Sequence, residues 1–265
     1  MASRFLSMNR AITQFCAALC SALFVVFGGS ASVAQSMPWI SPQVLSTTTG
    51  TDVMSTVLQD KAASADKSDE EAASRSTNGL TAKGRRNVAQ AAAVDFRYRY
   101  NPARTAQNMR SFLARAPSRA ARAELEQMLA AQPTLMGDIA AGVRAYGFDP
   151  HNVADAYAVW WVNVWGASEK RNVEPDAETV SAVKKQVYAA FAAMPGFAAT
   201  SDAERQEYAE ALLLQATMLG SAFEQWKNDP KMLDQLAAAA REGAKASGID
   251  LSLMTLTQNG FVPRS

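Results

Sequence analysis

The segment HNVADAYAVWWVNVW, residues 151–165, constrains the fold of this chain more than any other stretch. Asn152 followed by Asp155 is a variant of the capping box that starts a helix. At 100° per residue, the tyrosine and tryptophans fall mainly in one sector and valines in the opposite one, so both faces are largely apolar. A helix that is apolar nearly all round belongs in the middle of a bundle. The segment therefore predicts a central, aromatic-rich helix.

From about residue 96 onward the chain has helical periodicity interrupted by capping residues and helix breakers. Asn101 before a proline predicts one helix start, and Asp229 before a proline predicts another. Ser201 and Glu204 have the spacing of a capping box. No run of alternating β-branched residues is long enough for a sheet. These patterns predict an all-α domain, a single bundle of about six to seven helices around the aromatic-rich helix.

The segment after the last predicted helix, residues 249–265, alternates apolar and polar side chains. Such alternation favours an extended chain with one buried face. We expect it to lie extended against the bundle through Leu251, Leu253, Leu256 and Phe261.

The first 34 residues have the pattern of a cleavable signal peptide. Arg4 and Arg10 precede an apolar run, and the small residues at 32 and 34 place cleavage between Ala34 and Gln35. An uncleaved membrane anchor is the alternative, but the run is short for a span. Residues 35–94 are rich in Ser, Thr, Ala and charged side chains, which predicts a flexible tether. Residues 95–265 then form the helical domain, and we expect a periplasmic or secreted protein with no membrane span after cleavage.

The composition excludes several kinds of site. Cys16 and Cys20 both lie in the predicted signal peptide, and His151 is the single histidine. A disulfide, a thiolate site and a multi-histidine metal site are therefore excluded from the mature chain. Phosphate-loop, dinucleotide and zinc-protease patterns are absent as well. The sequence predicts no catalytic residue, no metal site and no cofactor.

The charge balance bears on the choice of partner. The chain has 26 basic and 25 acidic residues, and removal of Arg4 and Arg10 leaves 24 and 25, a net charge of about −1. This balance argues against nucleic acid as a partner.

The aromatic-rich helix also carries the residues that could bind a ligand or partner. A buried core is the favoured interpretation, and a lined pocket, where Trp and Tyr are enriched, is the alternative. Asp155 is explained by its place in the capping pattern, whereas the Asn163 amide must find hydrogen-bond partners within an apolar helix. The candidate binding residues are Asp155, Tyr157, Trp161, Asn163 and Trp165.

A cluster of arginines precedes the predicted central helix. Seven arginines lie between positions 97 and 122 with no acidic residue among them. They could form a surface for a polyanion or for anionic lipids. The acidic turn at Asp202, Glu204, Glu207 and Glu210 could instead face them, and a solvated, partly ion-paired surface is favoured. His151, where a helix begins, is interpreted as a loop histidine.

Four segments together resemble an uncharacterised family of exported bacterial proteins, described as a domain of unknown function. They are the Tyr98 to Pro102 entry and the stretches DAYAVWWVNVW, AEALLLQA and MTLTQNGFVPR. The resemblance covers roughly Arg97 to Arg264 and leaves out the signal peptide and the tether. It implies an exported, all-helical bacterial protein and supplies no catalytic residues.

Two functional hypotheses follow, from different classes. The first is a non-enzymatic binding or interaction protein of the cell envelope, whose partner would be an envelope protein or polymer. The second is a carboxylate-based hydrolase acting on an envelope polymer, which would use acids among Asp155, Glu169, Glu207 and Glu210. The sequence leaves the oligomeric state open.

Overall fold

The computed structural model describes residues 94–116, 118–193, 197 and 200–264. The predicted signal peptide and residues 35–93 of the predicted tether lie outside the described residues. Within them the chain forms seven α-helices, a short 3-10 helix and one β-hairpin. The α-helices are α5 (Pro102–Ala114), α6 (Arg119–Ala130), α7 (Leu135–Ala145), α8 (Val153–Ser168), α9 (Ala177–Ala193), α10 (Asp202–Trp226) and α11 (Pro230–Ala246). The 3-10 helix is η4 (Leu251–Leu253), and the hairpin strands are β1 (Met254–Thr257) and β2 (Gly260–Pro263).

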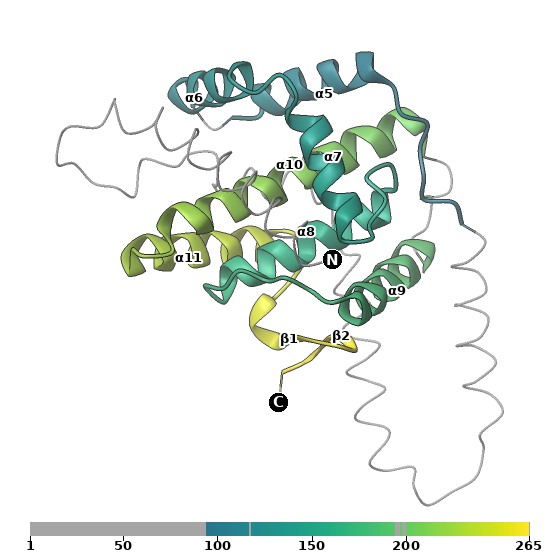
Figure 1. Ribbon diagram of the computed structural model, residues 1–265, viewed down its shortest axis with the longest axis vertical. Coiled ribbons are helices and arrows are strands. Elements are labelled where there is room, and N and C mark those ends of the chain that lie inside the picture. The colour runs from purple at the N-terminus through teal and green to yellow at the C-terminus, as the bar shows by residue number, and fades with distance from the viewer. Residues whose placement is uncertain (1–93, 117, 194–196, 198–199, 265) are drawn as a thin grey trace, which may run out of the picture.

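The aromatic-rich segment forms α8, which lies in the middle of the molecule (Figure 1). Helices α9, α10 and α11 all pack against it. Its side chains at Trp160, Trp161 and Trp165 are at most 1% exposed. Burying so much aromatic surface is a large favourable contribution to folding. The prediction of a central helix is therefore confirmed, and the fold is mostly α-helical where the sequence predicted an all-α domain.

Side-chain caps begin the helices at the positions that the sequence predicts. The Asn152 side chain accepts hydrogen bonds from the backbone N–H groups of Ala154 and Asp155 at the start of α8. Ser201 and Glu204 form a reciprocal capping box at the start of α10. Asn101 caps α5 and Asp229 caps α11, each before a proline in the first turn.

The C-terminal segment differs from the expected extended tail. It begins with η4 and then folds back on itself as the antiparallel hairpin β1–β2, in which Leu256 is opposite Phe261. Asn259-Gly260 is a hairpin turn signal, so the alternating segment pairs with itself. Leu251 and Phe261 are buried as predicted, but the prediction for Leu253 was wrong because its side chain is 64% exposed at the end of η4.

One glutamine of α9 holds the hairpin against the bundle. The Gln186 amide donates to the Phe261 carbonyl at 2.7 Å, and its oxygen accepts from the Phe261 N–H at 2.9 Å. Gly260 has a φ of 82°, and a Cβ there would lie 2.5 Å from the Gln186 oxygen, so only glycine suits the position. The Phe261 ring is thereby held over Trp161, with ring centroids 3.9 Å apart. The hairpin thus covers the aromatic side of α8.

Candidate functional site

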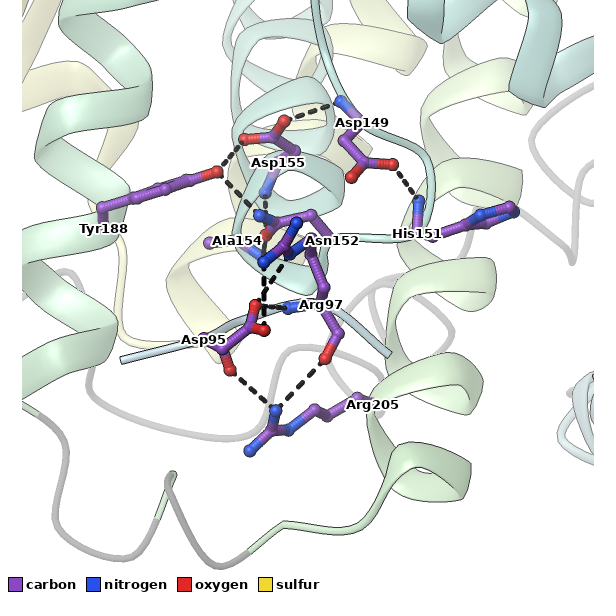
Figure 2. A network of polar contacts seen from close by, with 9 residues as sticks. All are labelled: Asp95, Arg97, Asp149, His151, Asn152, Ala154, Asp155, Tyr188 and Arg205. Atoms are coloured by element: carbon purple, nitrogen blue, oxygen red, sulfur yellow. Dashed lines mark hydrogen bonds and ion pairs between the residues drawn. The ribbon is translucent and has the colours of Figure 1, made fainter. Parts of the chain in front are cut away.

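A polar network surrounds the start of α8 (Figure 2). Asp155 is 0% exposed, and its carboxylate accepts hydrogen bonds from the Tyr188 hydroxyl at 2.8 Å and the Asp149 N–H at 2.6 Å. It also forms an ion pair with Lys184 of α9 at 2.9 Å. The Asn152 amide donates to the Tyr188 oxygen at 2.7 Å. This buried carboxylate therefore has an opposite charge and two further donors.

The network joins three parts of the fold. The Lys184 ammonium also donates to the Gly147 carbonyl at 3.1 Å, so one side chain joins α9, α8 and the loop between α7 and α8. Burial, and then the neighbouring Asp155 carboxylate, raise the pKa of Tyr188 well above its usual range. Its hydroxyl consequently stays protonated and donates to Asp155. Asp155, Lys184 and Tyr188 thus link α8 to α9 and to the loop before α8.

Of the remaining candidate residues of the aromatic-rich helix, three are buried and Asn163 is half-buried. Tyr157, Trp161 and Trp165 are buried, and the Trp165 N–H donates to the Met254 carbonyl at 3.3 Å. The amide of Asn163 donates to the Val159 carbonyl one turn earlier, at 2.8 Å, which supplies the partner that its position requires. Their part in binding stays a prediction, because their burial is what a core helix requires.

The arginine-rich surface is partly ion-paired, as the favoured interpretation expected. Glu207 of the acidic turn accepts from Arg104 at 2.7 Å and from Arg115 at 2.8 Å. Two pairs are local, Arg97 with Asp95 and Arg122 with Glu126. Exposed pairs of this kind contribute little to stability, about 0–1 kcal/mol each.

A pocket of about 220 Å³ opens beside α7, α10 and the segment that precedes α8. The face of α7 contributes Met136, Ala140 and Arg144, and α10 contributes Leu213 and Glu210. The volume is below the roughly 300–1,000 Å³ of sites for drug-sized ligands. The pocket is therefore too small for a drug-sized ligand.

An aromatic wall forms one side of this pocket. The His151 ring stacks on Tyr100, with centroids 5.0 Å apart and planes 13° apart, and lies 5.7 Å from the Tyr98 ring. The Tyr98 hydroxyl donates to the Pro150 carbonyl at 3.0 Å, which fixes its orientation. Tyr100 is 45% exposed and, with Leu253, is one of two large exposed hydrophobic side chains in the described part of the chain. The loop histidine of the sequence analysis is thus part of a half-exposed aromatic surface.

Glu210 is the one carboxylate that lines this pocket. It is 2% exposed and accepts from Thr105 at 2.6 Å, from Asn108 at 2.7 Å and from Gln206 at 2.9 Å. All three donors are neutral, and no ion pair to Glu210 occurs among the described residues. Burial, and then the Glu210 charge, raise the pKa of Tyr98 above its usual range. The pocket therefore contains a buried acid without an opposite charge.

The described residues contain neither a candidate metal cluster nor a candidate membrane-spanning helix. No cluster of three or more His, Cys, Asp or Glu side chains in that part of the chain could hold a metal ion. None of the described helices combines the length and the apolar character needed to cross a bilayer.

The fold and pocket define a class: a mostly helical domain built around one buried aromatic helix, with a small pocket at its side. The chain belongs to a family of unknown function, DUF6683, whose sequence model matches residues 13–264. The resemblance to a family of unknown function is confirmed to this extent, and the match begins well before the Arg97 expected from the motifs. Comparison with curated proteins gave no match, and comparison with solved structures gave none.

Sequence reasoning had named His151 and Glu210 but had not placed them together. Tyr100 and Arg144 were not recognised as site residues. The alternation of tyrosine and arginine before Asn101 was the one available signal for the aromatic wall, and it appeared only as part of a family resemblance. Nothing in a single sequence indicates that a face of α7 meets this segment.

Proposed function

We propose that this chain is an exported, non-enzymatic binding protein of the bacterial cell envelope. Its binding site is the pocket beside α7 and α10. The observation that carries the proposal is the pairing of the half-exposed Tyr100–His151 stack with the buried Glu210 carboxylate in one small pocket. Small-molecule sites commonly combine aromatic walls with a few polar groups in this way.

Export rests on the signal-peptide pattern of the first 34 residues. We expect the secreted or periplasmic form to begin at Gln35 or within a residue or two of it. Mass spectrometry of the purified protein measures this directly. An intact amino terminus would contradict export by cleavage and would restore Cys16 and Cys20 to the mature chain.

Hydrolysis is supported less well than binding. A glycosidase needs two carboxyl groups on either side of the scissile bond, whereas the pocket is lined by Glu210 alone among acids. Asp155 is paired with Lys184, and Glu169 is paired with Arg264 at 2.9 Å. Glu207 is engaged by two arginines. Turnover of peptidoglycan or glycan fragments by the purified domain would favour hydrolysis over binding.

The binding proposal is tested with a thermal-shift screen of a diverse library of small polar molecules and of small molecules extracted from bacterial envelopes. We expect at least one compound that raises the melting temperature of the wild type. The same compound should not stabilise Tyr100→Ala, because that variant lacks the open part of the aromatic wall.

Leu253→Ala is the matched control, since Leu253 is the other large exposed hydrophobic residue and does not line the pocket. It should bind the compound as the wild type does. A screen in which no compound distinguishes Tyr100→Ala from Leu253→Ala would remove the pocket as the binding site.

A further inference from the structure

The hydrogen bonds around Glu210 fix which groups point at it. Asn108 accepts from the Arg104 guanidinium at 3.0 Å through its oxygen, so its NH₂ group is the end that faces Glu210. Gln206 accepts from the Asn101 N–H at 3.0 Å, so its NH₂ group also faces the carboxylate. Both amide orientations are thus set by donors outside the cluster. Both amides therefore direct N–H groups at the Glu210 carboxylate.

The Glu210 carboxylate can accept one more hydrogen bond than it receives from the described residues. An ionised carboxylate has about four acceptor positions, and Thr105, Asn108 and Gln206 occupy three of them. Neutral hydrogen bonds do not cancel its charge, and a buried charge without an opposite one is costly. A cationic group entering the pocket would supply both the fourth hydrogen bond and the missing charge.

The aromatic wall favours the same kind of group. Tyr98, Tyr100 and His151 line the same pocket as Glu210, and their rings contact one another. The faces of tyrosine rings attract ammonium groups, most strongly where water is excluded. A carboxylate together with tyrosine rings is therefore suited to a protonated amine.

The positive charge of Arg144, which also lines the pocket, disfavours a ligand that carries only a positive charge. Arg144 lies in the last turn of α7. Its backbone carbonyl accepts from the Gly147 N–H, but its guanidinium forms no ion pair with another described residue. A guanidinium presents a planar fork that matches a carboxylate. The same small pocket thus has one group for an ammonium and one for a carboxylate.

We infer that the pocket binds a free α-amino acid, with its ammonium at Glu210 and its carboxylate at Arg144. The inference rests on the proposed binding function and adds the chemical class of the ligand. The small volume of the pocket and its apolar residues Met136, Ala140 and Leu213 accommodate a modest side chain.

The test uses the purified protein and the twenty free amino acids as individual probes, first by thermal shift and then by isothermal titration. We expect at least one amino acid to bind. Its N-acetyl form, which has lost the ammonium, and its methyl ester, which has lost the carboxylate, should each bind at least about tenfold more weakly. No binding by any amino acid, or equal binding by a derivative, overturns the inference.

Two variants assign each charge to its residue. Arg144→Gln should weaken the free amino acid at least about tenfold and leave the methyl ester unchanged, because the ester has no carboxylate to lose. Glu210→Gln should weaken the amino acid and leave its N-acetyl form unchanged. Arg110→Gln, an exposed arginine of α5 that does not line the pocket, is the matched control and should bind as the wild type does.

The outcomes separate this inference from the binding proposal. If the library screen yields a ligand that Tyr100→Ala loses and no amino acid binds, the ligand class is wrong and the pocket stands. If neither probe set gives a Tyr100-dependent ligand, both proposals fail. Because Arg144 is exposed, Arg144→Gln should fold even where Glu210→Gln does not, so the test does not depend on one variant.

Discussion

Two buried carboxylates, one at the start of α8 and one on α10, have opposite surroundings. Asp155 is 0% exposed and is paired with Lys184, whereas Glu210 is 2% exposed and is held by neutral groups alone. A buried charge with its counter-charge fastens elements of the fold together. A buried charge that lacks a counter-charge and lines a pocket can be stabilised by a ligand of opposite charge. The difference separates a structural region of this molecule from a candidate binding region.

The largest expected effect lies in the structural region. Trp161→Ala should lower the free energy of unfolding by about 3–5 kcal/mol, since it leaves a cavity in the core. The side chain is 0% exposed and stacks on Phe261 at 3.9 Å. Urea denaturation measures the loss, with Leu253→Ala as a control that should change stability by less than about 0.5 kcal/mol. An unchanged stability of Trp161→Ala would make α8 a binding helix instead of a core helix.

The next effect tests the paired carboxylate. Asp155→Asn should lower the free energy of unfolding by about 2 kcal/mol, because the Lys184 ammonium loses its counter-charge and a donor replaces an acceptor. Thermal and urea denaturation of Asp155→Asn, Lys184→Met and the double variant measures the loss of stability in each. The double variant should be less destabilised than the sum of the two single ones, since neither unpaired charge remains. Strict additivity would show that the ion pair does not couple the two helices.

The same isosteric change at the other carboxylate should have a smaller effect on stability. Glu210→Gln removes an uncompensated buried charge while it sets a new NH₂ group among donors, so the two contributions oppose each other. We expect a change within about 1 kcal/mol in either direction, measured under the conditions used for Asp155→Asn. A loss as large as that of Asp155→Asn would mean that Glu210 is as structural as Asp155.

The smallest expected effect is at the aromatic wall. Tyr100→Ala should change the free energy of unfolding by about 0.5–1 kcal/mol at most, the contribution of one exposed aromatic contact. Chemical denaturation beside the wild type measures it. A loss approaching that of Trp161→Ala would show that Tyr100 supports the fold, and its effect on ligand binding would then need no direct contact.

The helical parts of the fold were accessible from the sequence because their signals are local. Asn152, Ser201 with Glu204, and Asp229 each cap the helix that the pattern places there. The apolar character of both faces of α8 was enough to predict its burial. At the C-terminal segment the alternation around Leu256 correctly indicated extended backbone, but the turn at Asn259-Gly260 was missed. A hairpin was therefore predicted as one extended segment lying against the bundle.

The candidate site was less accessible, because its parts come from distant positions. Tyr100 precedes α5, Arg144 lies in α7 and Glu210 lies in α10, and no local pattern relates them. The arrangement depends on long-range hydrogen bonds such as that from the Asn101 N–H to Gln206. Asp155 is the opposite case, because the sequence named it as a candidate binding residue and the structure shows its carboxylate bonded to the Asp149 N–H, the Tyr188 hydroxyl and Lys184. Its part in binding stays a prediction.

The stack of Phe261 on Trp161 has a consequence for how the chain reaches its native state. The two rings are 100 residues apart in the sequence, from 161 to 261. During synthesis α8 emerges long before the hairpin that covers it, so its aromatic side stays open until residue 261 is available. Contacts of such separation slow folding, and exposed apolar surface in the interval invites aggregation. A chaperone that binds exposed aromatic segments would therefore find its target in α8 of the nascent chain.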